Sequence, residues 1–139
     1  MTKRQQIVEA MATALRGITG MATKVHIWKD PASLTPSDMP CIIVKDGRAD
    51  VGRQDLDGGY QHRLLIEAAW WSTGVSAWQD AQTGIDTMLA AFQADPTLGG
   101  LVLLDELTGH DIYTSQAGSI EAAGLLEFSL TYITDAGTL

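Results

Sequence analysis

The three histidines are the first side chains to consider as metal ligands or general bases. His26, His62 and His110 lie far apart in the sequence, and no two of them have the short spacing of a recognised metal motif. His26 and His62 both fall on expected strands, where they could meet only through chance pairing. The sequence therefore predicts no metal site, and each histidine is interpreted as solvated or at the edge of the core.

The other reactive side chains do not combine into a catalytic site either. Cys41 is the single cysteine and opens the apolar run CIIV, where a thiol usually packs as a small hydrophobic group. Asp105 and Glu106 are the one adjacent pair of acids, but adjacent side chains on a strand point to opposite faces. The sequence has no GxSxG motif and no phosphate-binding glycine loop before a helix. We therefore expect neither enzyme activity nor a cofactor.

The composition of the 139 residues is that of a globular protein, with 45% hydrophobic and 19% charged residues. The length favours a single domain over residues 1–139. No apolar run could span a bilayer and the first residues lack a signal-peptide core, so we expect assembly in a cytoplasm and no membrane partner. The net charge of −8 argues against a dedicated nucleic-acid-binding protein, which needs clustered Lys and Arg.

Charge is distributed unevenly along the chain. All nine Lys and Arg residues lie within 1–63 together with seven acids, whereas residues 64–139 contain ten acids and no Lys or Arg. A fold with a mildly basic side and a strongly acidic side is suited to head-to-tail association, in which one surface meets a different surface of the next copy. The alternative interpretation is that the acidic half keeps the protein soluble.

Hydrophobic periodicity predicts two helices and six strands in the order α-β-β-β-α-β-β-β. Helices are expected from Arg4 to Arg16, with Thr2 as the N-cap, and from Ser76 to the Asp95-Pro96 pair. The expected strands are 24–28, 41–44, 60–71, 101–107, 111–114 and 125–134. Runs of neighbouring strands favour an α+β fold, with a mainly antiparallel or mixed sheet and both helices packed on one face.

Two further features of this pattern bear on function. The second helix carries an apolar stripe that includes Trp78, and the adjacent Trp70 and Trp71 cannot both face inward on a regular strand. One of these two is expected in the core, and the other is available to anchor a protein contact. Residues 46–59 (DGRADVGRQDLDGG) are glycine-rich and charged with both signs, and are expected to form a long inter-strand loop.

The order of these elements resembles that of a known family. The opening helix RQQIVEAMATAL leads through a proline-rich segment to SDMPCIIVKDG, and the charged loop then precedes the strand YQHRLLIEAAWW. The second helix ends at ADPTLGGLV, and the last strand is LLEFSLTYIT. Over residues 4–134 the chain is similar to the tail terminator proteins of long-tailed, siphophage-type phages, the group typified by minor tail protein U.

The resemblance implies a structural virion protein. Six copies would form a homohexameric ring that caps the tail tube, ends its polymerisation and makes the tail side of the head-tail joint. The implied partners are further copies of the chain, the tail tube protein and the head-tail connector protein, while DNA passes through the lumen without specific binding. A head-tail connector or tail-completion subunit and a tail tube subunit are the alternatives; a phage, a prophage and a gene transfer agent are all compatible origins.

Closure of a ring requires two different surfaces that fit each other. We place part of this oligomer interface in the charged loop and at the start of the following strand. The chosen residues are Arg48, Arg53, Asp55, Asp57 and Arg63. The alternative interpretation is a solvated loop that contacts no other subunit.

Overall fold

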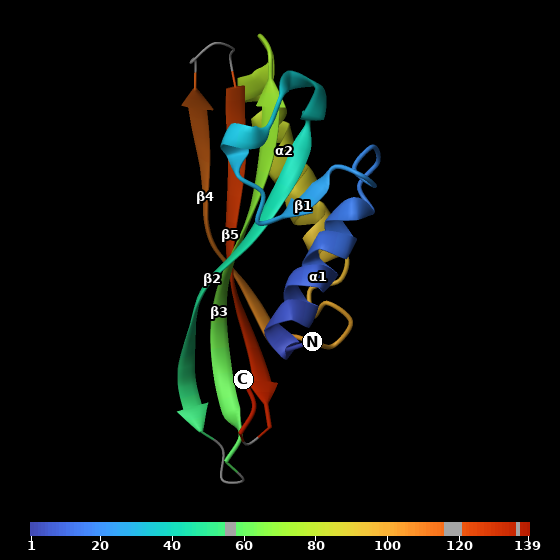
Figure 1. Cartoon of the computed structure of the whole chain (residues 1–139). Helices are drawn as coiled ribbons and strands as arrows, with labels where there is room; N and C mark the ends of the chain where they lie inside the picture. The colour runs from blue at the N-terminus through green and yellow to red at the C-terminus, as the bar shows by residue number, and fades with distance from the viewer. Residues whose placement is uncertain (55–57, 116–120, 136) are drawn as a thin grey trace.

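The computed structural model describes residues 1–54, 58–115, 121–135 and 137–139 and contains a five-stranded sheet and two helices (Figure 1). The helices are α1 (Lys3–Arg16) and α2 (Ala77–Gln93). In order across the sheet, the strands are β1 (Val25–Ile27), β2 (Cys41–Gln54), β3 (Tyr60–Thr73), β5 (Glu121–Thr134) and β4 (Leu104–Ser115). β1 is parallel to β2, and all other neighbours are antiparallel. The predicted α+β fold with a mixed sheet is therefore confirmed.

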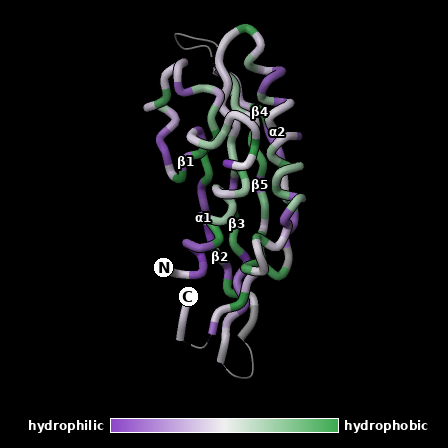
Figure 2. The backbone as a smooth tube through the Cα atoms, turned by 90° about the vertical axis from the view of Figure 1, so that its right-hand side faces the viewer, coloured by the Kyte–Doolittle hydropathy of each residue, from purple (hydrophilic) through white to green (hydrophobic). Residues whose placement is uncertain are grey.

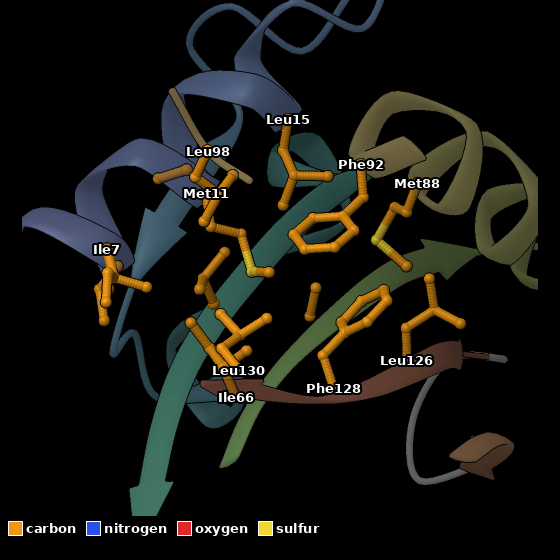
Figure 3. Packing of buried hydrophobic residues seen from close by; sticks show 14 of the residues in the cluster. Ile7, Met11, Leu15, Ile66, Met88, Phe92, Leu98, Leu126, Phe128 and Leu130 are labelled. Carbon is orange, nitrogen blue, oxygen red and sulfur yellow. The ribbon is translucent and has the colours of Figure 1, made fainter. Parts of the chain in front are cut away.

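Both helices pack on one face of the sheet, and the main hydrophobic core lies between the helices and the strands (Figures 1 and 3). Phe92 of α2 stacks on Phe128 of β5, with ring centres 4.4 Å apart. In Figure 2, hydrophobic residues run along β5 and the neighbouring helix α2. Other large buried side chains of this core are Ile7, Met11, Leu15, Leu64, Ile66, Met88, Leu126 and Leu130. The helices thus cover the face toward which alternate residues of β3 and β5 point.

Two glycines allow α2 to approach the sheet closely. A side chain at Gly84 of α2 would collide with the indole ring of Trp70, and one at Gly124 of β5 would collide with the carbonyl oxygen of Ala81. Trp70 therefore lies beneath α2, whereas Trp71 lies on the opposite face of the sheet, which we call the outer face. The expected division of the two tryptophans between the two faces is confirmed.

The N-terminal end of α1 agrees with the expectation from the sequence, whereas that of α2 differs from it. The side chain of Thr2 accepts a hydrogen bond from the backbone of Gln5, whose side chain accepts one in return from the Thr2 backbone. Ser76, the expected start of the second helix, makes no capping hydrogen bond with its side chain, and α2 begins one residue later, at Ala77. Trp78 is 55% exposed, because the buried side of α2 begins at Ala77 and the next residue points away from the sheet.

The expected inter-strand loop 46–59 is wrong for most of its length, because β2 continues to Gln54. This part of β2 pairs with β3 as far as the Gln54–Tyr60 pair, so that the two strands form a long hairpin (Figure 1). Two bulges shift the register within it. Each bulge interrupts the two-residue alternation by which a strand is recognised in a sequence. The bulges lie between Asp46 and Ala49 and between Val51 and Arg53.

Strands β4 and β5 are also longer than expected. β4 joins residues 104–107 of the first expected strand to the second, 111–114, since a bulge between Leu107 and Gly109 absorbs the interruption between them, whereas residues 101–103, also expected in a strand, lie before β4. β5 begins at Glu121 instead of Leu125. Its first residues are alanines and a glycine, which have low strand propensity, but α2 passes over them and requires small side chains there.

We expect Phe92→Ala to lower the free energy of unfolding by about 3–5 kcal/mol, because it removes the ring that stacks on Phe128 and leaves a cavity in the main core. Urea denaturation measures this loss. Val75→Ala is the matched control: Val75 is 96% exposed, and its truncation should change stability by no more than about 0.5 kcal/mol. A loss below about 1 kcal/mol for Phe92→Ala would contradict this packing.

His62 is buried within the β3–β5 ladder and is electrically neutral. Its ring stacks on that of Tyr132, with ring centres 4.6 Å apart, and its Nε2 lies 2.8 Å from Oγ1 of Thr134. The Thr134 hydroxyl donates its single proton to the carbonyl oxygen of Thr138, so it accepts a hydrogen bond from His62 Nε2. Burial lowers the pKa of His62. The neutral ring therefore carries its proton on Nε2.

Acid should destabilise the fold through His62. Because its pKa is lower in the folded than in the unfolded chain, the unfolded chain takes up the proton first as the pH falls below about 6.5. The melting temperature should therefore fall between about pH 7 and about pH 5.5. His62→Gln, which keeps a donor toward Thr134, should flatten this dependence.

His26 should also destabilise the fold in acid, because burial and the charge of Lys29 lower its pKa. His26→Gln is therefore measured in parallel to separate the two contributions. An unchanged pH dependence in His62→Gln would show that His62 does not bind the proton on unfolding.

Candidate oligomer interface

Arg48 and Arg63, two of the residues chosen from the sequence, lie on the outer face of the β2–β3 hairpin. Nε of Arg48 is 2.6 Å from Oδ1 of Asp50, and both side chains are largely exposed. Asp50 also stands directly opposite Arg63 in the ladder. The hydrogen bond and charge of Asp50 raise the pKa of Arg48. The structure thus places two of the chosen arginines at positions next to one carboxylate.

Another of the chosen residues, Arg53, lies near the end of the same hairpin. Arg53 is on β2, opposite Gln61 of β3, whereas Asp55 and Asp57 lie outside the described residues. A polar hollow of about 450 Å³ opens nearby on the outer face. It is lined by Asp50, Gly52, Gln61, His62, Arg63 and Thr131. This part of the hairpin therefore offers polar groups to a partner from its outer face.

Trp28 is held in a costly backbone conformation at the edge of the sheet. It directly follows β1, has a φ of 56° and is 58% exposed. Left-handed backbone is uncommon for a bulky residue, and such strain gathers at functional positions. Its indole Nε1 donates to Oδ1 of Asp46 at 2.5 Å, and Nζ of Lys45 lies 5.7 Å from the ring centre. A large exposed ring held in one orientation is typical of residues that dominate protein interfaces.

Asp46 connects Trp28 to the first turn of α1. Its Oδ2 accepts from Nε of Arg4 at 2.5 Å, and Nη2 of Arg4 also donates to the carbonyl oxygen of Gly47. Burial by itself would raise the pKa of Asp46, but the hydrogen bonds from Trp28 and Arg4 outweigh burial and hold the pKa below its usual value. The ionised carboxylate therefore fixes both side chains.

This cluster has no short-range signature in the sequence. Arg4 and Trp28 lie 42 and 18 positions from Asp46, and the three residues meet only because α1 packs beside the end of β1 and the middle of β2. The one local hint is a tryptophan that follows a short strand and precedes Lys29. Periodicity does not predict a left-handed residue at that point.

The order of strands places the basic residues and several of the acidic residues at opposite edges of the sheet. Residues 1–54, which form α1, β1 and β2, contain eight of the nine Lys and Arg residues. At the opposite edge of the sheet, β4 contains Asp105, Glu106 and Asp111 and no Lys or Arg. One edge of the sheet is therefore basic in character and the other is acidic.

A second surface for a partner is a small apolar groove on the outer face. Its volume is about 140 Å³, and Trp71 and Tyr113 lie along it, the latter 53% exposed. Ile43, Ala69 and Leu125 are among the other lining residues. Of Trp70 and Trp71, one of which the sequence predicts to be available for a protein contact, Trp71 therefore lines an open groove.

The described residues contain no group of three or more His, Cys, Asp or Glu side chains that could hold a metal ion. Burial raises the pKa of the Cys41 thiol to about 11, so that the thiol is protonated near neutral pH. Within the same residues, neither helix has the length and apolar character needed to cross a membrane.

Comparison with known proteins finds similar chains among the solved structures. No family model matches the sequence, and no curated protein matches it. The chain is similar to a chain in the virion of a native gene transfer agent particle, with a TM-score of 0.43 and 14% sequence identity. This match covers 91% of the present chain and 94% of the other.

We expect Asp46→Ala to lower the free energy of unfolding at neutral pH by about 1–2 kcal/mol, because it removes the hydrogen bonds that the partly exposed Trp28 and Arg4 side chains donate to the carboxylate. Asp50→Ala is the matched control, since it removes an exposed ion pair and should cause a smaller loss. Both losses are measured by urea denaturation. Equal small losses would show that Asp46 does not hold the cluster together.

Proposed function

We propose that this chain is a structural virion protein of a phage-type particle. Six copies form a ring that caps the tail tube, ends its polymerisation and provides the tail side of the head-tail joint. The tail tube protein and the head-tail connector protein bind its two ends, and DNA passes through the lumen. The motifs shared with tail terminator proteins over residues 4–134 support this role.

The observation that carries the ring is the difference between the two edges of the sheet. β2 with α1 provides a basic edge, and β4 provides an acidic one. A two-fold dimer formed through either edge would place like charges together, whereas a head-to-tail contact joins opposite charges. Repetition of a head-to-tail contact about an axis produces a closed ring when the rotation closes.

The surface of the chain is large enough for two such contacts. The accessible surface is 7638 Å², and a standard interface buries about 800 Å² on each partner. Two interfaces would therefore cover about a fifth of the surface, which leaves both ends of the ring open to the tube and the connector.

Absolute mass in solution tests the proposal, with light scattering over a wide concentration range and negative-stain imaging of large species. We expect a closed sixfold ring. Arg48→Glu combined with Arg53→Glu should shift the equilibrium toward smaller species, because it reverses two charges on the basic edge. A stable two-fold dimer without any larger ring would contradict the proposal.

Growing tail tubes distinguish the cap from the alternative roles. Added protein that fixes the length of the tubes supports the terminator role. Tubes that keep growing in its presence favour a connector, and fibres formed by the protein alone at high concentration favour a tube subunit.

A further inference from the structure

We infer that neighbouring copies join edge to edge, with residues 104–107 of β4 of one copy antiparallel to residues 46–50 of β2 of the next. The inference rests on the proposed ring and names the two surfaces that close it. The partner at each edge is a second copy of this chain.

Both edges lack a further described strand over part of their length, and at the β2 edge Arg4 donates a hydrogen bond to the carbonyl oxygen of Gly47. β1 pairs with β2 only from Ile42 to Val44, and beyond Val44 no other described strand pairs with β2 on that side. β4 is the last strand at the opposite edge, and its partner among the described strands is β5. An unpaired strand edge is a template for a strand of another chain, through backbone hydrogen bonds.

The strand directions suit a ring. β2, β3, β5 and β4 alternate in direction across the sheet, so β2 and β4 run in opposite directions (Figure 1). When a copy is rotated about an axis that lies roughly along the strands, each of its strands keeps its direction. Residues 104–107 of its β4 therefore meet β2 of its neighbour as an antiparallel strand, whereas beyond the bulge at Leu107–Gly109 β4 lies level with β1, and the pairing with β2 ends there.

The ladders place Glu106 level with Arg48 across the sheet. Glu106 pairs with Ser129 of β5, and Ser129 pairs with Leu65 of β3. Leu65 lies opposite the first bulge of β2, which contains Arg48. Both charged side chains are exposed, and Arg48 keeps 84% of its side chain accessible. A rotation about the strand direction preserves this level, so Glu106 of one copy meets Arg48 of the next on the outer face.

The same ladders place an apolar pair on the helix-covered face. Leu107 pairs with Phe128, Phe128 pairs with Ile66, and Ile66 pairs with Asp46. Asp46 holds Trp28 beside this position, and the Leu107 and Trp28 side chains are 43% and 58% exposed. Leu107 of one copy therefore covers Trp28 of the next. The strained tryptophan becomes the apolar centre of the joint, next to the ion pair on the opposite face.

The charges of β2 and β4 determine which strand edges of two copies can pair. β4 carries three acids and no Lys or Arg, whereas residues 45–54 of β2 carry three basic residues and two acids. Pairing of β4 with β4 would oppose three acids on each strand. The bulges on both edges also bend the strands and prevent indiscriminate pairing. The remaining favourable contact is β4 against β2.

Engineered cysteines test this contact on the full chain. The native cysteine should not interfere, because Cys41 is buried and its thiol is protonated near neutral pH. Arg48→Cys with Glu106→Cys should give, on oxidation, a ladder of covalent species that ends at the hexamer, since a disulfide forms only when the Cα atoms lie within about 7 Å. A mixture of the two single variants should give a covalent dimer. Arg48→Cys with Gln79→Cys, the second cysteine on exposed α2, is the matched control and should give no ladder.

The outcomes separate this inference from the proposed function. A ladder together with a closed ring supports both. A closed ring without bonds between positions 48 and 106 overturns the edge contact and leaves the ring standing. Bonded chains that grow into fibres support the edge contact and overturn the cap. Monomers that neither bond nor form rings at high concentration overturn both.

A charge exchange tests the same contact without cysteine. Glu106→Arg should weaken association about fivefold, and Arg48→Glu in the same chain should restore it, because the pair is reversed rather than removed. Failure of the double variant to recover any association would overturn the pairing of these two residues. Asp86→Arg, an exposed acid on α2, is the control for the change in net charge.

Discussion

The continuous ladder between β3 and β5 is the interaction on which the rest of the structure depends. Every residue of β3 pairs with one of β5, without a shift in register. This regular pairing determines which side chains face α1 and α2 and which face outward. The core around Phe92 and Phe128 therefore forms on one face, and the helices cover it. Elements that depart from regular pairing lie farther out, on β2 and β4.

A two-layer fold of this kind leaves edge-strand backbone and outer-face side chains that no other described strand or helix covers. The helices satisfy one face, but the outer face and the two sheet edges remain available for other molecules. Trp28 shows this most directly, since an ion pair and a hydrogen bond hold a large ring in an exposed position. Such ordering has a conformational cost that a buried contact with another copy would offset. The proposed ring accounts for these features together.

Local patterns predict the elements that have a regular period. The helix from Arg4 to Arg16 and the strand from Tyr60 to Trp71 are recognised because their apolar residues repeat every three or four positions, or every second position. The sequence predicts a loop over 46–59 because two bulges break the period of residues 46–54, whereas backbone pairing with β3, which the sequence does not display, keeps that segment extended. The apolar period also places Trp78 in the buried stripe, although small residues rather than large ones mark the buried side at the start of α2.

The candidate interface also contains residues that the sequence indicates and residues that only folding brings together. Arg48 and Arg63 belong to a region whose charge is evident in the sequence, whereas Trp28, Arg4 and Asp46 become neighbours only through folding. By itself the sequence determined the α+β class, the two amphipathic helices and the uneven charge, because composition and periodicity are local properties. Only the tertiary structure decided the order of strands, and hence that basic and acidic residues lie at opposite edges with an exposed tryptophan between α1 and β2. Hydrogen bonding between distant segments sets that order, and no local pattern contains it.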